Sequence, residues 1–188
     1  AVAAALAAAA ARGAAAQNWF SPSGVVAADS VPTANWGTID GSTLARWFDG
    51  DTDTLFYTRN TVRAYATFDL GAVYHVVGFR HRGADDVLLD CGAWSVSASV
   101  DGAAYAEYVT SAPCPTDRYE TAAVDVYARY VRVSACRCGG GNVADCDSFC
   151  SVALAGTGVG VREFQIDGTE FTGGALPPTP MRDESGAI

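Results

Sequence analysis

Through the middle of the chain, apolar and polar residues alternate one by one, which is the pattern of a half-buried β-strand. In the clearest run, 94–100, Trp94, Val96 and Ala98 alternate with serines. Turn-forming pairs such as Asp101-Gly102 separate the runs. The alternation predicts strands at 62–70, 74–79, 94–100, 105–110, 121–127, 130–135 and 161–166.

The same stretch holds no convincing amphipathic helix between residues 17 and 171. Several short strands at this spacing are typical of a β-sandwich or barrel. Two sheets packed face to face would bury the alternate residues. The sequence therefore predicts an all-β sandwich as a single domain, which also suits a length of 188 residues.

The two ends of the chain differ from the middle. Alanine occupies twelve of the residues 1–16, and this stretch has three interpretations: a secretory-signal remnant, an ordered helical arm, or a stand-in for an uncertain local sequence. Residues 172–188 contain Gly173-Gly174, Pro177-Pro178 and Pro180 and then a polar finish, which predicts an extended tail. The folded unit is expected to span 17–171.

Composition narrows the possible partners. The net charge is −9, and all twelve basic residues are arginine. An acidic surface repels phosphate backbones and anionic lipids, so nucleic-acid binding is excluded and membrane docking is disfavoured. Leu88-Leu89 is the one candidate for a membrane-docking spike, and no basic residues surround it.

Six cysteines point to three disulfides and an oxidising, extracellular compartment. Cys91 and Cys114 flank the strand pair at 94–110, which favours their pairing. Four more lie in the spacing Cys-x-Cys-x7-Cys-x3-Cys and would cross-link a Gly-rich insert: Cys136, Cys138, Cys146 and Cys150. The alternative for these four thiolates is a zinc site.

Motifs for catalysis are missing from the sequence. It contains no Gly-x-Ser-x-Gly, no phosphate-binding glycine loop and no His-Glu-x-x-His. Its two histidines, His75 and His81, are assigned to a strand and a loop. The protein is therefore expected not to be an enzyme.

Six short motifs, in this order, resemble the discoidin domain, also called the coagulation-factor C-terminal type domain, which is similar to galactose-binding-like carbohydrate-binding modules. They cover about residues 25–168 and lie at 48–54, 66–71, 76–80, 94–102, 128–133 and 161–168. The resemblance implies a jelly-roll β-sandwich of about eight main strands, with loops gathered at each end. A fold of this kind hosts many functions, so the ligand needs its own argument.

Three aspartates lie within five residues at 49–53, beside two threonines. Hard cations such as Ca²⁺ take six to eight oxygen ligands from carboxylates, hydroxyls and carbonyls. In the resembled family this loop often holds a structural calcium, closed by an acidic residue on the last strand. The resemblance implies Asp49, Asp51, Thr54 and Glu163 as ligands. The alternative is that Asp49 and Asp53 only cap turns.

A sugar site needs planar apolar surfaces together with fixed polar donors, such as an arginine fork. In the resembled carbohydrate-binding relatives an arginine near Arg82 commonly contacts the sugar. The candidate set is Trp36, His81, Arg82 and Asp85, with Asp86 in place of Asp85 as a variant. The alternatives are a core Trp36, a solvated His81, and an Arg82 that only pairs with Asp85 or Asp86.

Taken together, the sequence predicts a non-catalytic module, secreted or on a cell surface, that binds a glycan or a glycosylated partner and is stabilised by Ca²⁺ and disulfides. The alternative function is a structural subunit of a large extracellular, appendage or virion assembly. In that case the alanine-rich arm and the proline-rich tail would reach into neighbouring subunits.

Overall fold

The structure is a computed structural model that describes residues 17–22, 25–27, 44–58, 63–86, 89–136 and 158–176. Apart from one short 3₁₀ helix, η1 (Leu44–Trp47), the regular elements in these residues are all strands. The strands are β1 (Trp19–Phe20), β2 (Val25–Ala27), β3 (Phe56–Tyr57), β4 (Arg63–Gly83), β5 (Asp85–Asp86), β6 (Leu89–Asp90), β7 (Ala93–Ser99), β8 (Ala106–Pro113), β9 (Glu120–Cys136) and β10 (Gly160–Glu170). The described part of the chain contains no helix with the length and apolarity that a membrane crossing requires. Residues 1–16 and 177–188 lie outside it.

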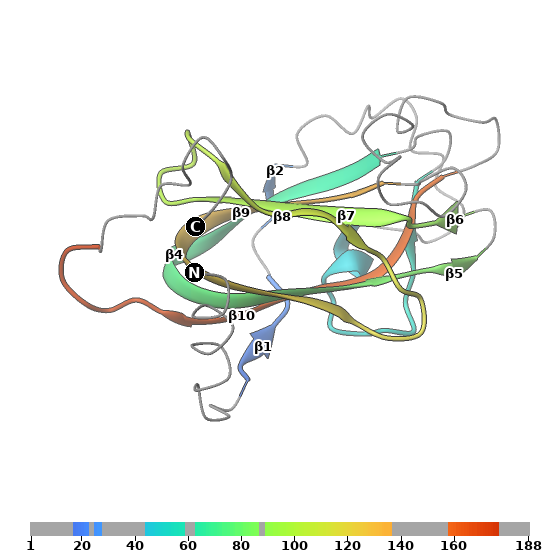
Figure 1. The fold of residues 1–188 in the computed structure, drawn as a ribbon, viewed down its shortest axis with the longest axis horizontal. Helices are drawn as coiled ribbons and strands as arrows, with labels where there is room; N and C mark the ends of the chain where they lie inside the picture. The colour runs from blue at the N-terminus through green and yellow to red at the C-terminus, as the bar shows by residue number, and fades with distance from the viewer. Residues whose placement is uncertain are drawn as a thin grey trace, which may run out of the picture.

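Two long strands build both layers of the sandwich. β4 and β9 pair antiparallel from Arg63↔Cys136 to Asp69↔Tyr130, lose register, and resume from Tyr74↔Ala128 to His81↔Glu120. The first layer contains the early half of β4 and the late half of β9, followed by β7 and β8. The second contains the remaining halves, followed by β10 and β1. Figure 1 shows β4 curving from one layer into the other.

This curvature corrects part of the strand prediction. Separate strands were expected at 62–70 and 74–79, and also at 121–127 and 130–135. Each pair is instead one strand that bends without ending. In β4 the bend contains Gly71, whose φ is +82° and whose N–H donates to Asp69 Oδ1 at 2.9 Å. Glycine adopts this left-handed conformation without a steric penalty, so the strand bends there and continues, although its pairing with β9 shifts register.

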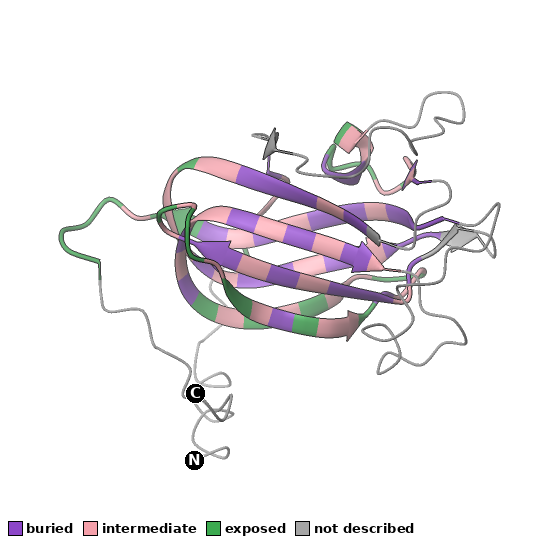
Figure 2. Cartoon of the chain, turned by 90° about the horizontal axis from the view of Figure 1, so that it is seen from above, coloured by how far each residue is buried: buried purple, intermediate pink, exposed green. Residues whose placement is uncertain are grey.

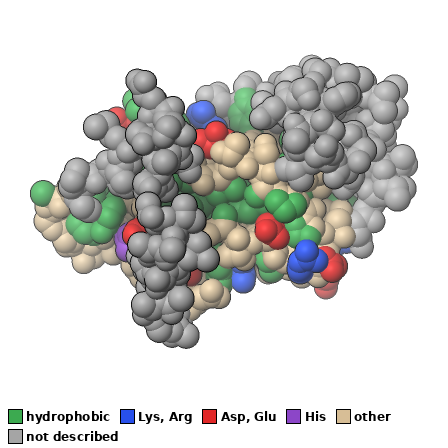
Figure 3. Space-filling view, in the orientation of Figure 1, with side chains coloured by type: hydrophobic (Ala, Val, Ile, Leu, Met, Phe, Trp, Pro, Cys, Tyr) green, Lys and Arg blue, Asp and Glu red, His purple; other side chains and the backbone are tan. Residues whose placement is uncertain are grey.

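The core fills the space between the layers. Buried and half-buried residues alternate along the central strands, as Figure 2 shows. At the centre, Phe164 stacks on Phe68 and Phe79 with ring centroids 6.3 and 6.0 Å apart, and Trp94 meets its edge. All four side chains are at most 1% exposed. On the face that Figure 3 shows, hydrophobic side chains form a band along the middle of the molecule, among polar and charged ones. Burial of large aromatic side chains is the main stabilising contribution of this centre, at roughly 1.5–3 kcal/mol for a residue such as phenylalanine.

The sandwich has two different ends. At the bend end, β4 and β9 cross between the layers near Asp69 and Tyr130. At the loop end, η1 closes the space between the layers: Trp47 stacks on Phe56 at 5.7 Å, and Phe48 meets the edge of Phe68 at 4.3 Å. The loop end also carries β5, β6 and the disulfide between Cys91 and Cys114, which confirms the predicted pairing.

Gly83 lies directly against this disulfide. A Cβ atom at this position would come within 2.9 Å of the Cys114 carbonyl oxygen and 3.1 Å of its Sγ atom. Real Cβ atoms do not approach backbone atoms that closely. The end of β4 therefore needs glycine for its close packing against Cys114.

Candidate functional site

The loop that follows η1 is fixed to the sandwich by buried aromatic side chains. Trp47 is fully buried and Phe48 is 8% exposed. These two side chains therefore anchor the start of the loop in the core of the sandwich. Gly50 has φ +78°, and its N–H donates to Glu163 Oε2 at 3.1 Å. On the far side, Arg162 Nη1 donates to the Thr52 carbonyl oxygen at 3.1 Å. The loop is thus tied to two neighbouring residues of β10.

The Thr54 hydroxyl lies among four acceptor oxygens. Its Oγ1 atom is 2.8 and 3.1 Å from the two carboxylate oxygens of Asp49. It is also 3.0 Å from the Asp51 carbonyl oxygen and 3.3 Å from the Arg46 carbonyl oxygen. A hydroxyl has a single proton and cannot donate to all four oxygens at once. Carboxylate, carbonyl and hydroxyl oxygens gathered at one point are the ligand types that hard cations prefer.

Glu163 lies beside this cluster and is fully buried. Ser21 Oγ donates to its Oε1 at 2.7 Å, and Gly50 donates to Oε2. Burial raises the pKa of Glu163 to about 7, and the negative charge of Asp49 adds to the rise, while these two donors and Arg80 oppose it. A buried carboxylate next to another acid is costly to ionise, so a positive charge at this position would stabilise both.

Two aspartates of the loop, Asp49 and Asp51, also cap turns through their side chains. Asp49 Oδ1 accepts from the Asp51 N–H, and Asp51 Oδ1 accepts from the Asp53 N–H, both at 2.9 Å. These are the turn caps that the alternative interpretation proposed, made by Asp49 and Asp51 in place of Asp49 and Asp53. Within the described residues, no three acidic groups of this loop bring their ligand atoms within 4.8 Å of one another. Asp51 thus faces Thr54 through its carbonyl.

Arg82 and Arg80 lie on the outer face of β4. Arg82 is half-buried, and its Nε donates to the Thr116 carbonyl oxygen at 3.1 Å, which orients the guanidinium. Arg80 lies between the rings of Trp19 and Tyr119, 4.4 and 4.2 Å from their centroids, and its guanidinium donates to Gln165 Oε1. The outer face of the second layer therefore combines planar aromatic rings with fixed arginine donors.

The prediction that His81 contacts a ligand is wrong. His81 lies within β4, not in a solvated loop, and none of its surface is exposed. Trp47 Nε1 donates to its Nε2 at 3.1 Å, and burial lowers the pKa of His81 to about 3, so the ring is neutral with its proton on Nδ1. That N–H points at Cys114 Sγ, 3.2 Å away. His81 is a core residue that supports the loop end.

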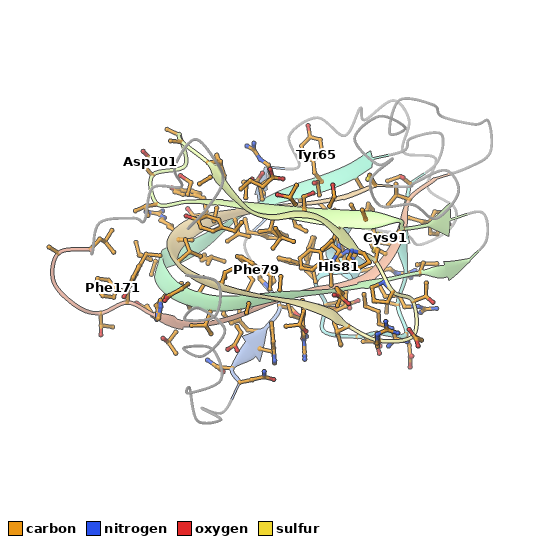
Figure 4. The ribbon with its side chains drawn as sticks, in the orientation of Figure 1. Tyr65, Phe79, His81, Cys91, Asp101 and Phe171 are labelled. Atoms are coloured by element: carbon orange, nitrogen blue, oxygen red, sulfur yellow. A yellow bond between two sulfur atoms is a disulfide. The ribbon has the colours of Figure 1, made fainter. Side chains whose placement is uncertain are left out.

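His81, Cys91 and Cys114 bring their ligand atoms within 4.8 Å of one another, and this is the single such group among the described residues. Figure 4 shows His81 and Cys91 close together in the interior at the loop end. The two sulfurs are bonded to each other, and the His81 nitrogen that faces them carries a proton. The group therefore has no lone pairs arranged for a metal ion.

Other predicted positions fall outside the described residues. They include Trp36, the Leu88 part of the Leu88-Leu89 pair, and three of the late cysteines, Cys138, Cys146 and Cys150. The backbone of Asp85 and Asp86 forms β5, and Cys136 ends β9. The pairing of the late cysteines, and the zinc alternative for them, stay predictions.

Sequence reasoning missed the Arg80 cluster. Its signal was present, because Arg80 and Arg82 alternate with the core residues Phe79 and His81 and so share the outer face. The stacking of Trp19 and Tyr119 on Arg80 was not visible, because these rings come from segments 61 and 39 residues away along the chain.

Comparisons with solved structures identify the fold of this chain. The C-terminal domain of a chitobiase from Bacteroides fragilis is similar over 82% of this chain and 96% of that chain, with 16% identity and a TM-score of 0.54. The module CBM32-1 from a family 31 glycoside hydrolase of Clostridium perfringens covers 70% of this chain and 89% of its own, also at 16% and 0.54. This chain has the galactose-binding-like, or discoidin-like, fold.

A fragment of a putative chitobiase from Bacteroides thetaiotaomicron shares this fold, with 16% identity, a TM-score of 0.51, and coverage of 71% of this chain and 80% of that chain. No protein-family model and no curated protein matches the sequence. The predicted all-β jelly-roll sandwich is confirmed by the galactose-binding-like fold. At identities this low the likeness concerns the backbone arrangement, and the chemistry must come from the residues of this chain.

Proposed function

We propose that this chain is a non-catalytic module that binds glycans. The observation that carries the proposal is its likeness to solved carbohydrate-binding modules, of which CBM32-1 is one at a TM-score of 0.54. In galactose-binding-like folds the loops at the ends of the sandwich are free to vary while the strands keep their positions. A rigid sandwich that carries variable loops suits recognition better than chemistry.

The proposed binding face lies at the loop end, around Arg82. The Nε atom of Arg82 donates to the Thr116 carbonyl oxygen, which orients the two Nη groups of the guanidinium. These groups therefore lose little conformational freedom when they bind sugar hydroxyls. Trp36 and Asp85 complete the proposed set, as an aromatic surface and an acceptor. His81 is not part of it, because it is buried.

The first experiment is a glycan-array screen of the whole chain, with Arg82→Ala as the test and Arg118→Ala as the matched control. Arg118 is an exposed arginine that pairs with its neighbour Asp117. We expect Arg82→Ala to weaken binding about 10- to 100-fold, since bonds from a charged donor contribute about 1.5–3 kcal/mol. Arg118→Ala should bind like the unchanged protein. Absence of binding to any glycan by the unchanged protein would reject the proposal and leave the assembly-subunit alternative.

We also propose that the loop at 46–54 holds a structural calcium ion. The four oxygens around Thr54 Oγ1 and the buried carboxylate of Glu163 fit such an ion. The ligands would be the carboxylate of Asp49, the Thr54 hydroxyl, the carbonyls of Arg46 and Asp51, and Glu163. A bound calcium would supply the positive charge that lets Asp49 and Glu163 both stay ionised.

Thermal unfolding with added calcium, compared with a chelator, tests this proposal. Because an ion that binds the folded state alone stabilises it by mass action, millimolar calcium should raise the Tm by several degrees. Asp49→Asn should abolish the rise, whereas Asp117→Asn, at an exposed acid away from the loop, should keep it. An equal Tm with calcium and with chelator would contradict the proposal.

An extracellular location is part of the same proposal. The Cys91–Cys114 disulfide at the loop end supports it, because disulfides persist mainly in oxidising compartments. Non-reducing mass mapping of the protein isolated from its native source tests this step. A Cys91–Cys114 peptide would support an oxidising compartment, and reduced thiols in the native protein would argue against it.

A further inference from the structure

A hollow at the bend end has no role in the proposed site. It has a volume of about 320 Å³. Three tyrosines, Tyr105, Tyr108 and Tyr127, provide its aromatic lining. Asp101 lies on its rim and is far from His81 and Cys91 in Figure 4, at the other end of the sandwich. We propose that this hollow is a second binding site that takes one neutral sugar ring.

The size of the hollow suits one ring. Ligand sites typically measure about 300–1,000 Å³, so this one is at the small end of that range. Small side chains form much of the remaining wall, at Ala98, Ala104 and Ala106. They leave the space open where larger residues would fill it. The occupant is therefore a compact group and not an extended chain.

Two of the rings are held in place from outside the hollow. Arg132 lies over the Tyr105 ring at 4.2 Å and also donates through Nε to Thr67 Oγ1 at 3.2 Å. His75 stacks on Tyr127 with centroids 4.8 Å apart, and Phe171 meets the edge of Tyr127 at 5.0 Å. Rings that are fixed before the ligand arrives lose little freedom on binding, which favours affinity.

The polar groups of the hollow suit hydroxyls. Each tyrosine offers a flat apolar surface together with an O–H that donates or accepts, as a sugar with apolar faces and hydroxyl edges requires. Ser99 Oγ and the backbone N–H groups of Ala103 and Ala104 donate to Asp101 Oδ1, which fixes this carboxylate at the hollow. A carboxylate has acceptor capacity beyond these bonds and can also accept from a ligand hydroxyl.

The charge of the residues that line the hollow disfavours an anionic ligand. Among the nine residues that line the hollow, Asp101 carries the one formal charge, and no arginine or histidine lines it. An acidic sugar or a phosphate would face this carboxylate without a basic partner. The choice of a sugar over another compact neutral ligand rests on the proposed glycan-binding function. The location at the bend end does not depend on it.

The test uses the full chain labelled at tyrosine ring carbons, titrated by NMR with methyl β-galactopyranoside and, separately, with N-acetylglucosamine. We expect saturable shifts of the Tyr105 and Tyr127 signals with a Kd in the millimolar range for at least one probe. Ala104→Trp fills the hollow from its exposed rim and should weaken this binding at least tenfold. Ala103→Trp, at an exposed neighbour that does not line the hollow, should leave it unchanged.

Arg82→Ala separates the two sites. If the tyrosine shifts persist in this variant while array binding is lost, the bend-end site is independent and supported. If the array shows no binding but the tyrosine signals still titrate, the function proposed for the loop end fails and this inference stands. Absence of saturable shifts with both probes overturns the inference. Equal shifts in Ala104→Trp, or their loss in Arg82→Ala, also overturn it.

Discussion

The loop end and the bend end are built from the same two long strands but are held together in different ways. At the loop end the groups that hold the two layers together are buried. They are the Cys91–Cys114 disulfide, the neutral His81 ring, and Trp47 between the layers. At the bend end the main polar contact is the Asp69–Arg129 pair, at 2.7 and 2.8 Å, and both partners are partly exposed.

The difference shows what each end requires. At the bend end the backbone itself connects the layers, so side chains add little and can instead surround a hollow. At the loop end the layers terminate, and long connections start from them, so buried side chains must hold the edges together. Loops that carry a binding face need such a rigid base, because a misplaced donor loses its geometry.

The largest difference in stability between the two ends is expected when the Trp47 side chain is removed. Trp47→Ala opens a cavity between the layers and removes the donor to His81 Nε2, so it should cost about 3–5 kcal/mol of the free energy of unfolding. Tyr127→Ala at the bend end, where the side chain is half-buried, should cost about 1–2 kcal/mol. Urea unfolding measures both. Equal losses would mean that the two ends are held equally.

Removal of the disulfide comes next. The double variant Cys91→Ala with Cys114→Ala releases a crosslink with a sequence separation of 23 residues. By loop-closure entropy it should lose about 3.5 kcal/mol. The variant is preferred to a reducing agent, which would act on every cysteine. A loss under 1 kcal/mol in urea unfolding would show that Trp47 and His81 alone hold the loop end.

The pH dependence of the free energy of unfolding tests whether the Glu163 carboxyl is buried with a raised pKa. Its pKa is raised from 4.5 to about 7 in the folded protein, so the folded state keeps a proton that the unfolded state releases. Without calcium, the free energy of unfolding should therefore fall as the pH rises from about 4.5 to 7, by at most about 3 kcal/mol, and level off above that.

Glu163→Gln should remove this pH dependence, and calcium should reduce it in the unchanged protein, because the ion favours the ionised carboxylate. Unfolding in chelator across this range is the measurement. A profile that rises or stays flat from pH 4.5 to 7 would contradict the burial of Glu163.

The smallest effect is expected at the bend end. Bonds from Arg129 and from the Gly71 N–H lower the pKa of Asp69 to about 2, so the stability that this pair adds is fully present above about pH 4 and is lost as the pH falls through 2. Arg129→Gln should lower the Tm slightly at pH 5, and the gap to the unchanged protein should close toward pH 2. Arg118→Gln is the exposed control. A gap that stays constant with pH would show that the pair does not stabilise the fold.

The alternation of residue types was enough to predict the strands and the sandwich, because a period of two directly reports which side of a sheet is buried. It could not show that β4 and β9 each continue through a bend. Leu70-Gly71 has the residues of a turn, and whether a glycine ends a strand or bends it depends on the partner strand, which local sequence does not specify.

The sequence pointed to some residues of the candidate site and misassigned another, for similar reasons. Asp49, Thr54 and Glu163 were named by the family resemblance; in the structure Thr54 lies against Asp49, and Glu163 accepts from the Gly50 N–H of the same loop. His81 was misassigned, because a histidine beside two arginines looks like part of a polar loop. Its burial depends on Trp47, a residue 34 positions earlier, which satisfies the ring nitrogen. Long-range pairs of this kind leave no local pattern.

The passage of β4 and β9 through both layers has a consequence for how the molecule opens. Both layers are built on the same two continuous strands, so neither layer can unfold as a unit without loosening the strands that continue into the other. The amide protons of Val133 in the first layer and Val76 in the second should therefore exchange with solvent through one common opening event. A ligand at either end would then slow amide exchange across the whole sandwich, far from the residues it touches.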